Sequence, residues 1–331
     1  MSRALSIVLG LSPTGLYAIR ELGQAGIAVL GIDTRFQAGC LSRFLSHPSR
    51  YLLPQTDAEL MQHIEAAAAA WDGPVVLLPT SDRYIEWLTT HAERLAQSCS
   101  MSGAYRNGHA MQLLDKKAFA RLCERHRIAR PQQVSCDSAG LEQAAAKLRF
   151  PLLLKPVRIH QQLELMAGRK VFIASNQGEV KALADKLQLH PGAWLMQEII
   201  PGPDSNISLY AGYFDATGQA QRRFSGRKLR QYPPGFGSAS LVDNQRVEAA
   251  ETISETLLQA LPYSGIAGAE FKFDERDQQL KMIEINPRPT LWFDITRRAG
   301  IGLSLSAVLE LTGEEALATT TAQQALLWRY F

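Results

Sequence analysis

The chain has 331 residues, of which 46% are hydrophobic and 20% are charged, and its formal net charge is +3. This length favours two or three subdomains over one small core. The small charge gives no sign of general nucleic-acid affinity, and no apolar run reaches the ~20 residues of a membrane-spanning helix. Because the 4 cysteines lack metal-ligand spacing, we expect reduced thiols in a cytoplasmic protein that binds neither nucleic acid nor membrane.

The first hundred residues alternate apolar strands with helical patterns. The strands are "ALSIVLG", "IAVLGID" and "VVLLPTSD", and helical spacing follows at Thr14 to Gln24 and again after Tyr84. Strands separated by helices are typical of a doubly wound parallel sheet. We therefore expect residues 1–110 to form a Rossmann-like domain.

The first loop of this domain resembles a dinucleotide-binding loop only in part. Gly10, Gly15 and Asp33 fit that pattern, but Ser12 stands where the second glycine is needed, and Pro13 follows it. That glycine lets the backbone approach a pyrophosphate. We therefore expect a Rossmann-like domain that uses this loop for another purpose.

The next segment has an α+β pattern. A helix is expected within "LLDKKAFARLCERHRIARP", with Asp115 as its N-cap and a stop before Pro131. Strands at "QQVSC", "FPLLLKP", "KVFIAS" and "AWLMQE" then alternate with helices at 138–148 and 177–187, the second of them capped by Asn176. Residues 111–196 are therefore predicted to form a small α+β subdomain.

The C-terminal part has longer strands, and two of them flank "ERDQQ" as a predicted hairpin. Pairing about Asp277 places Glu270 opposite Glu284, and the period of two puts Asn286 on the same face. The other face is expected to be apolar, formed by Phe271, Phe273, Ile283 and Ile285.

Two facing glutamates repel each other unless a positive charge lies between them. Oxygen ligands at this spacing suit Mg²⁺, which binds one or two carboxylates and completes its shell with water and phosphate oxygens. Glu270, Glu284 and Asn286 are therefore candidate metal ligands. The alternative is a solvated sheet face that Lys272 neutralises.

A magnesium site of this kind normally accompanies a polyphosphate, and the sequence offers cations for one. In "RRFSGRKLR", strand alternation would let Arg222, Lys228 and Arg230 converge while Arg223 and Arg227 point away; the alternative is a solvated basic edge strand.

A separate cation, Lys155, ends the apolar strand "PLLLK", where an unpaired charge is costly to bury. Its partner is expected to be a nucleotide phosphate or, alternatively, a buried carboxylate.

An adenine pocket needs a backbone donor and a backbone acceptor side by side in an apolar slot. Residues 198–200, before the turn Pro201-Gly202-Pro203, can offer both, and Asp204 can accept from ribose hydroxyls. Taken alone, this signal is weak because strands often end in such turns.

In this order, the segments resemble the ATP-grasp superfamily of ATP-dependent carboxylate–amine or carboxylate–thiol ligases over essentially the whole chain, most specifically at Glu270 and "EINPR". The resemblance is to the stand-alone type that includes D-aspartate ligase, and to the ATP-grasp unit of the carbamoyl-phosphate synthase large chain. It implies an α/β ATP-grasp fold: a Rossmann-like domain at 1–110, a small α+β lid subdomain at 111–196, and a larger antiparallel-sheet subdomain with the metal site at 197–331.

The resemblance also implies roles for individual residues. It implies ATP and two Mg²⁺ as cofactors, for which Mn²⁺ can substitute, and Glu270, Glu284 and Asn286 correspond to the residues that hold these ions. Lys155 and Lys117 (or Lys116) correspond to phosphate-side lysines, and Lys228 (or Arg227) to a later basic residue. Arg288 corresponds to the arginine that faces the acyl phosphate. The residues that correspond to the adenosine contacts are Gln197, Glu198, Ile200 and Asp204.

Two regions relate to the family less directly. Ser12, Thr14 and Asp82 are candidates for the substrate side of the Rossmann-like domain, although Ser12 and Thr14 equally suit helix capping. The family's glycine-rich phosphate loop is replaced by "VRIHQQLELMAGRK", in which Gly168 is the single glycine. Here the covering of the phosphates would fall to side chains, namely Arg158, His160, Arg169 and Lys170.

The mechanism that the resemblance implies has two steps: ATP converts a carboxylate into an acyl phosphate, and an amine then displaces the phosphate. Lys228 and Arg288 are the catalytic candidates, and the substrates would be small molecules such as amino acids or peptide-like acids. Two other functions stay open, namely a non-catalytic ATP-binding regulatory module and bicarbonate-using carboxy- or carbamoyl-phosphate chemistry. A homodimer also stays open.

Overall fold

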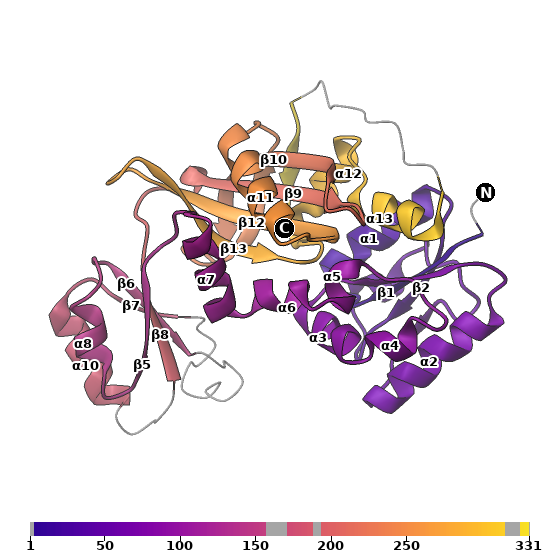
Figure 1. Ribbon diagram of the computed structural model, residues 1–331, viewed down its shortest axis with the longest axis horizontal. Coiled ribbons are helices and arrows are strands. Elements are labelled where there is room, and N and C mark those ends of the chain that lie inside the picture. Colours follow the sequence, from indigo (N-terminus) through magenta and orange to yellow (C-terminus); the bar gives the residue numbers. More distant parts are fainter. Residues whose placement is uncertain (1–2, 157–170, 188–192, 315–324, 331) are drawn as a thin grey trace.

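The computed structural model describes residues 3–156, 171–187, 193–314 and 325–330, and its strands form three sheets (Figure 1). A parallel sheet lies in the N-terminal part, a small antiparallel sheet in the middle and a larger antiparallel sheet in the C-terminal part. No helix in the described ranges is both long and apolar enough to cross a membrane.

The N-terminal sheet has the strand order β3-β2-β1-β4, and all of its pairs are parallel. Every residue of β1 (Leu5–Leu9) and β4 (Val75–Pro79) is buried, as expected for strands covered on both faces. The remaining strands are β2 (Ala28–Ile32) and β3 (Tyr51–Leu52). The helices of this part are α1 (Pro13–Gln24), α2 (Asp57–Ala70), α3 (Asp82–Thr90), α4 (Ala92–Leu95), α5 (Gly103–Arg106) and α6 (His109–Leu114), with a 3₁₀ turn at Ala38–Leu41.

The first loop uses its glycines for packing. A Cβ on Gly15 would lie 1.9 Å from the carbonyl oxygen of Gly10, so only glycine lets α1 begin this close to β1. Asp33 accepts hydrogen bonds from the backbone N–H groups of Leu11 and Thr34, both at 2.7 Å. The features that resemble a dinucleotide fingerprint are thus occupied in holding the loop together.

The small antiparallel sheet has the order β5-β8-β6-β7, formed by Gln133–Asp137, Ala193–Glu198, Leu152–Pro156 and Phe172–Ala174. Helices α8 (Leu141–Ala145) and α10 (Gln177–Leu187) pack with it. Asn176 accepts from the N–H of Glu179 at 3.0 Å, which confirms the predicted cap of α10.

The helix that precedes this sheet is shorter than predicted. Asp115 caps α7 (Lys116–Arg125) by accepting from the Ala118 N–H at 2.7 Å, as expected. The helix ends well before Pro131, because Arg127 adopts a left-handed φ of 54° and the Ile128 N–H donates back to the Cys123 carbonyl at 2.8 Å. This six-to-one bond terminates helices irrespective of a following proline.

The large antiparallel sheet has the order β13-β12-β9-β10-β11-β14. Its strands are β9 (Ile207–Phe214), β10 (Ala220–Tyr232), β11 (Ser238–Asp243), β12 (Gly265–Asp274), β13 (Gln279–Asn286) and β14 (Leu327–Arg329). Strands β11 and β14 were not predicted, because β11 contains mainly small and polar residues and β14 has three residues. The helices are α11 (Glu248–Ala260), α12 (Asp294–Arg298) and α13 (Leu303–Thr312), with 3₁₀ turns at Asp204–Asn206 and Leu291–Phe293.

The hydrophobic cores divide the molecule into two bodies. Leu5 and Leu77 of the parallel sheet share one cluster with Tyr210 and Phe271 of the large sheet. The small sheet has a separate cluster around the fully buried Trp194. The first and third parts are therefore packed together, and the small sheet with α8 and α10, here called the small lobe, is set apart (Figure 1). The subdomain boundaries expected after residues 110 and 196 fall inside α6 and β8 and stay predictions.

Candidate active site

A cavity of about 860 Å³ lies where the small lobe meets the large sheet. Strands β6 and β8 of the lobe contribute to one side, and β10, β12 and β13 of the large sheet contribute to the other. The candidate residues that line it are Lys155, Gln197, Glu198, Ile200, Asp204, Lys228, Glu270, Glu284, Asn286 and Arg288. Side chains that are far apart in the sequence thus meet at one cavity.

The β12–β13 hairpin has the predicted register at its functional end. Glu270 pairs with Glu284, and Gly268 pairs with Asn286. A register shift follows Glu270, so that Phe271 pairs with Met282 and not with Ile283. Ile283 was expected on the apolar face away from Glu284, and that prediction is wrong: the irregularity leaves it half-buried on the cavity wall, which Glu284 also lines.

Lys228 is the cation of the basic run that reaches this cavity. Its side chain is 2% exposed, and its Nζ lies 2.7 Å from the carboxylate of Glu270. The predicted convergence with Arg222 and Arg230 is wrong, because neither lines the cavity and β10 changes register between Lys228 and Arg230. Arg230 is exposed and donates to Ser240 Oγ at 3.1 Å.

Arg227 has a different partner from Lys228. Its guanidinium forms an ion pair with Asp243 at 2.6 Å. Of the two cations that the resemblance left open for the later phosphate-side position, the geometry therefore favours Lys228.

The end of β13 forms a chain of polar contacts. Asn286 Nδ2 donates to Glu284 Oε1 at 3.0 Å, and Arg288 Nη2 donates to Asn286 Oδ1 at 3.2 Å. The Nε of Arg288 donates to Asp82 Oδ1 at 2.5 Å. Because Asp82 begins α3, this ion pair connects the end of β13, which carries two candidate metal ligands, to the Rossmann-like part.

These residues fit a hard divalent cation by their chemistry. Glu270 and Glu284 lie opposite each other on adjacent strands and line the same cavity, and both offer carboxylate oxygens. In the described ranges, no group of three or more His, Cys, Asp or Glu side chains is arranged to hold a metal. The candidate set differs from such groups because its third member is the amide of Asn286.

Lys155 lies in an environment that disfavours its charge. Burial is the main cause, and with the neighbouring cation Lys116 it lowers the pKa of Lys155 to about 8, against the opposing effect of Glu284. Its Nζ donates to Gln197 Oε1 at 3.2 Å, and within the described ranges no ion pair includes it. The alternative of a buried ion pair is therefore not supported there, and a cavity-lining cation is left for an anionic ligand.

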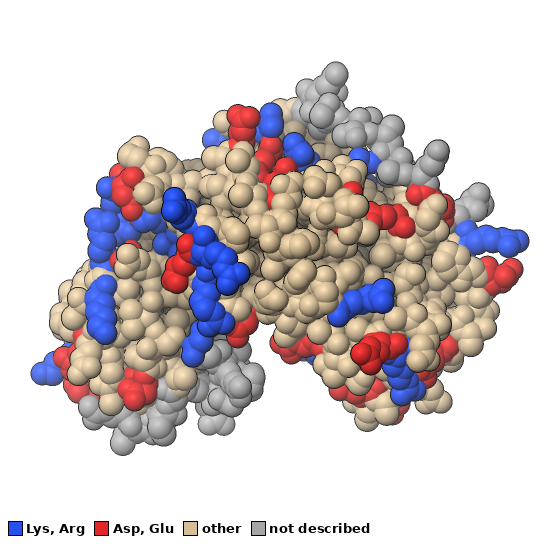
Figure 2. Space-filling model, viewed as in Figure 1, with Lys and Arg blue, Asp and Glu red and all other residues tan. Residues whose placement is uncertain are grey.

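The geometry favours Lys116 over Lys117 as the second phosphate-side lysine. Lys116 lines a smaller cavity of about 200 Å³ that also contacts Lys155, Glu284 and Asn286. Lys117 is exposed and lines neither cavity. Figure 2 shows Lys and Arg side chains along α7, where the exposed cations are Lys116, Lys117, Arg121 and Arg125. Both assignments stay predictions, and Lys116 is the lysine that lines a cavity.

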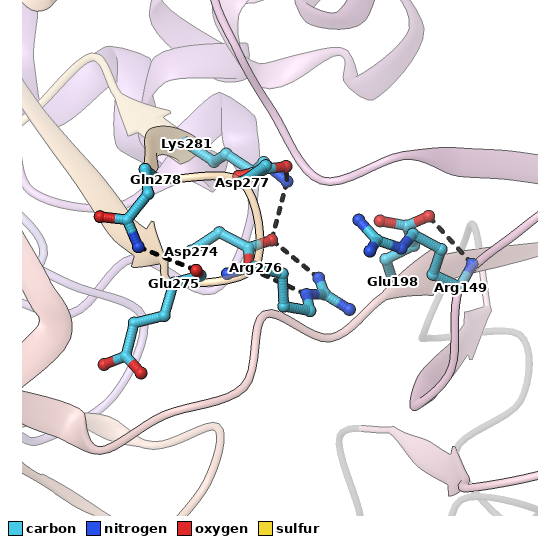
Figure 3. A network of polar contacts seen from close by, with 8 residues as sticks. All are labelled: Arg149, Glu198, Asp274, Glu275, Arg276, Asp277, Gln278 and Lys281. Carbon is cyan, nitrogen blue, oxygen red and sulfur yellow. Dashed lines mark hydrogen bonds and ion pairs between the residues drawn. The ribbon is translucent and has the colours of Figure 1, made fainter.

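The adenosine-side candidates occupy the end of β8 and the following turn. Ile200 is 5% exposed and lines the cavity with Leu153 and Ile173, which provides an apolar slot. The carboxylate of Glu198 accepts from the Arg149 N–H at 3.0 Å, and Figure 3 shows the Asp274–Arg276 pair beside it. The Glu198 side chain is thus engaged with the protein framework. The backbone N–H groups of Glu198 and Ile199 are engaged as well, since they donate to the carbonyls of Gln132 and Pro151 at 2.9 and 2.8 Å.

Asp204 is held by a residue that the sequence did not single out. Gln231 donates to both carboxylate oxygens of Asp204 and lines the cavity beside it. Lys272, considered only as a neutralising surface charge, also lines the cavity and donates to the Gly202 carbonyl at 2.8 Å. Its position two residues after Glu270 is the signal that would have indicated this.

The other candidates divide between the site and regions away from it. Thr14 lines the main cavity, whereas Ser12 precedes α1 without a side-chain capping bond. The predicted phosphate-covering residues Arg158, His160, Gly168, Arg169 and Lys170 lie outside the described residues.

Two known enzymes are similar to the chain in sequence. No protein-family model matches the chain. The chain is 24% identical over 225 residues to D-aspartate ligase of Enterococcus faecium, which covers 64% of this chain and 53% of that protein. It is 24% identical over 339 residues to a formate-dependent phosphoribosylglycinamide formyltransferase of Methylococcus capsulatus, which covers 94% of this chain and 79% of that protein. The chain thus spans about half the length of the first relative.

Solved structures agree with the sequence relatives. N5-carboxyaminoimidazole synthetase of Staphylococcus aureus superposes with a TM-score of 0.71 at 13% identity, covering 98% of this chain and 81% of that chain. In sequence and in fold, the chain is thus similar to members of the ATP-grasp superfamily. The predicted ATP-grasp fold, with its parallel N-terminal sheet and its small and large antiparallel sheets, is thereby confirmed.

Structures with this ATP-grasp fold have been solved with nucleotides. The Staphylococcus aureus synthetase has been solved with ADP. A biotin carboxylase domain dimer of the Hydrogenobacter thermophilus 2-oxoglutarate carboxylase has been solved with MgADP and bicarbonate; its TM-score is 0.69 at 14% identity, covering 97% of this chain and 73% of that chain. At such identities, the likeness extends to the fold alone.

Proposed function

We propose that this protein is an ATP-dependent ligase that activates a carboxylate as an acyl phosphate for attack by an amine, with ADP and phosphate as products. The observation that carries the proposal is the pairing of Glu270 with Glu284 on adjacent strands, at the wall of a cavity that Lys155, Lys228 and Arg288 also line. Carboxylates and cations around one cavity suit phosphoryl transfer, which depends mainly on positioning and on neutralising charge.

In this proposal, Glu270, Glu284 and Asn286 hold two Mg²⁺, for which Mn²⁺ can substitute. When bound, these ions would neutralise the charge of the phosphate oxygens. Lys155 and Lys116 contact the phosphates from the small-lobe side. Lys228 does so from the large sheet, where Glu270 holds its Nζ in place.

The adenosine would occupy the apolar slot at the end of β8. Leu153 and Ile200 would contact the base, and the backbone of residues 198–200 would pair with its edge. Gln197 would lie near the adenine amino group while orienting Lys155. Asp204 would accept from the ribose hydroxyls.

The chemistry follows in two balanced steps. A carboxylate oxygen of the substrate attacks the γ-phosphorus of ATP, the bond from that phosphorus to the β,γ-bridging oxygen breaks, and ADP leaves. The amine then attacks the acyl carbon, the bond from that carbon to the phosphate oxygen breaks, and the amine loses a proton as phosphate leaves. Arg288, held by Asp82, would stabilise the charge that develops on the acyl phosphate.

The test combines product analysis with isotope transfer. Purified protein with MgATP and pooled amino acids and small carboxylic acids should release ADP and phosphate when an acid and an amine are both present. Once the acid is identified, its ¹⁸O-labelled carboxylate should transfer one ¹⁸O to phosphate. Release of AMP and pyrophosphate, or phosphate without the label, would contradict the acyl-phosphate route.

Glu284→Gln tests the metal assignment within the same assay. Loss of the carboxylate should lower turnover by roughly 100-fold or more, because the Mg²⁺ ions that would neutralise the transferring phosphate lose a ligand. Glu275→Gln is the matched control, since Glu275 is an exposed glutamate in the turn of the same hairpin. Equal turnover of the two variants would remove Glu284 from the metal site.

Bicarbonate-using chemistry is the second candidate. It is favoured by the fold similarity to N5-carboxyaminoimidazole synthetase and to a biotin carboxylase domain solved with bicarbonate. ATP turnover that requires bicarbonate and persists without an organic acid would select it. ATP binding without turnover under either condition would instead select the regulatory module.

A further inference from the structure

Gln231 is a buried residue on the cavity wall whose backbone N–H and side-chain amide both donate hydrogen bonds to nearby residues. It is 5% exposed and lies near the end of β10. Its backbone N–H donates to Asp204 Oδ2 at 3.1 Å, and its Nε2 donates to Asp204 Oδ1 at 2.7 Å and to the Gly235 carbonyl at 2.9 Å. One residue thereby joins the Asp204 carboxylate to the segment that follows β10.

The hydrogen bonds from Gln231 leave part of the Asp204 carboxylate available to other donors. A glutamine amide has two N–H donors, and in Gln231 both are used. An ionised carboxylate has about four acceptor positions, and Gln231 occupies one on each oxygen of Asp204. Each oxygen therefore keeps capacity for one further donor, in a group whose orientation is fixed from one side.

The second partner of the amide belongs to the same cavity wall. Gly235, Phe236 and Gly237 all line the cavity. A Cβ on Gly237 would lie 2.2 Å from the Pro233 carbonyl oxygen, so the segment is tightly folded on itself. The Gln231 amide thus fixes the distance between this segment and Asp204.

We propose that Gln231 is a positioning residue that holds the Asp204 carboxylate ready for two adjacent hydroxyl groups, so that the site selects a ribonucleotide over its deoxy analogues. This inference rests on the proposed ATP site. With a vicinal diol, each carboxylate oxygen receives one hydroxyl donor. A deoxyribose leaves one oxygen without its donor, and a polar group left unmatched in a binding site costs affinity.

The experiment compares Gln231→Met with Gln221→Met. Gln221 lies on the same strand and also donates to an aspartate, at Asp215 Oδ2, but it is exposed and away from the cavity. Isothermal titration calorimetry measures the Kd of each protein for ATP, 2′-deoxy-ATP and 3′-deoxy-ATP in the presence of Mg²⁺. Thermal unfolding confirms that each variant is folded.

For the wild-type protein and Gln221→Met, we expect ATP to bind about 10-fold tighter than either deoxy analogue. In Gln231→Met, the affinity for ATP should fall by about 10-fold while the deoxy analogues change little, so that the discrimination is nearly lost. Retained discrimination in folded Gln231→Met would overturn the inference alone. Failure of the wild-type protein to bind ATP would overturn the proposed function as well.

A double-mutant cycle with Asp204→Asn separates positioning from general structure. If Gln231 acts through Asp204, Gln231→Met should add less than about 2-fold to the loss of ATP affinity that Asp204→Asn already causes. Additive losses would assign Gln231 a structural role and overturn the proposal. Should Gln231→Met fail to fold, the ATP-to-deoxy ratio of Asp204→Asn decides: a ratio unchanged from wild type overturns the proposal.

Discussion

At the scale of single residues, the site is organised by cations whose partners come from other elements. Lys228 pairs with Glu270 across the large sheet, and Arg288 pairs with Asp82 of the Rossmann-like part. Lys155 differs, because its described partner is the neutral amide of Gln197. Burial therefore disfavours the charge of Lys155, which has no ion-pair partner among the described residues, and an anionic ligand would supply the counter-charge.

The lowered pKa of Lys155 predicts a pH dependence. A lysine is cationic below its pKa, so with a pKa of about 8 the charge that we propose to bind phosphate is present at pH 7 and lost as the pH rises through 8. We expect kcat/KM for MgATP to fall with a midpoint near pH 8. In Lys155→Arg, which stays charged, this fall should disappear. A profile of the wild-type protein that stays flat to pH 9 would exclude Lys155 as the controlling group.

At the scale of elements, glycines and strand irregularities set where the side chains lie. Gly15 lets α1 begin against β1, and the shift after Glu270 moves Ile283 from the core to the cavity wall. A second shift in β10 separates Lys228 from Arg230. A strict period of two fails at both shifts, because an irregularity changes the face of every following residue relative to its partner strand.

The close approach of α1 to β1 predicts a stability effect. In Gly15→Ala, the new Cβ would lie 1.9 Å from the Gly10 carbonyl oxygen, so the backbone must move. We expect the free energy of unfolding to fall by about 3 kcal/mol, as measured by urea denaturation.

Gly178→Ala in α10 is the control for this change. Its Cβ would meet only the side-chain oxygen of Asn176, at 3.2 Å. Its free energy of unfolding should change by less than about 1 kcal/mol. Similar losses in the two variants would show that the α1 contact has no special role.

At the scale of the whole molecule, two bodies with separate cores line the main cavity between them. The parallel and large sheets share hydrophobic clusters, whereas the small lobe packs around its own Trp194. Residues on both bodies line the cavity, so a ligand there contacts the two at once. Separate cores also allow one body to open locally while the other stays folded.

Trp194→Ala tests this separation. The fully buried Trp194 donates its indole N–H to Ser138 Oγ at 3.2 Å, and its loss should cost the small lobe about 3–5 kcal/mol. Hydrogen exchange should accelerate in 133–156, 172–187 and 193–198 while the parallel and large sheets keep their protection. Loss of protection throughout the chain would show that the bodies unfold as one.

Much of the fold and part of the site could be predicted from the sequence alone. The hairpin register that pairs Glu270 with Glu284 follows from two alternating strands and a short turn, and the N-caps Asp115 and Asn176 follow from local hydrogen bonding. These features involve neighbours in the chain, so their residue pattern is sufficient. The ATP-grasp fold was likewise predictable, because its strands and helices occur in a recognisable order.

Only the tertiary structure decided which candidate side chains meet. Arg288 and Asp82 are 206 positions apart, and no local pattern connects them. Helix orientation decides that Lys116, and not Lys117, lines a cavity. A strand irregularity separates Lys228 from Arg230, and the hydrogen bond from Gln231 to Asp204 forms at a cavity between two bodies. The sequence by itself determined most of the strands and the residue types on them, whereas long-range packing determined which side chains face the same cavity.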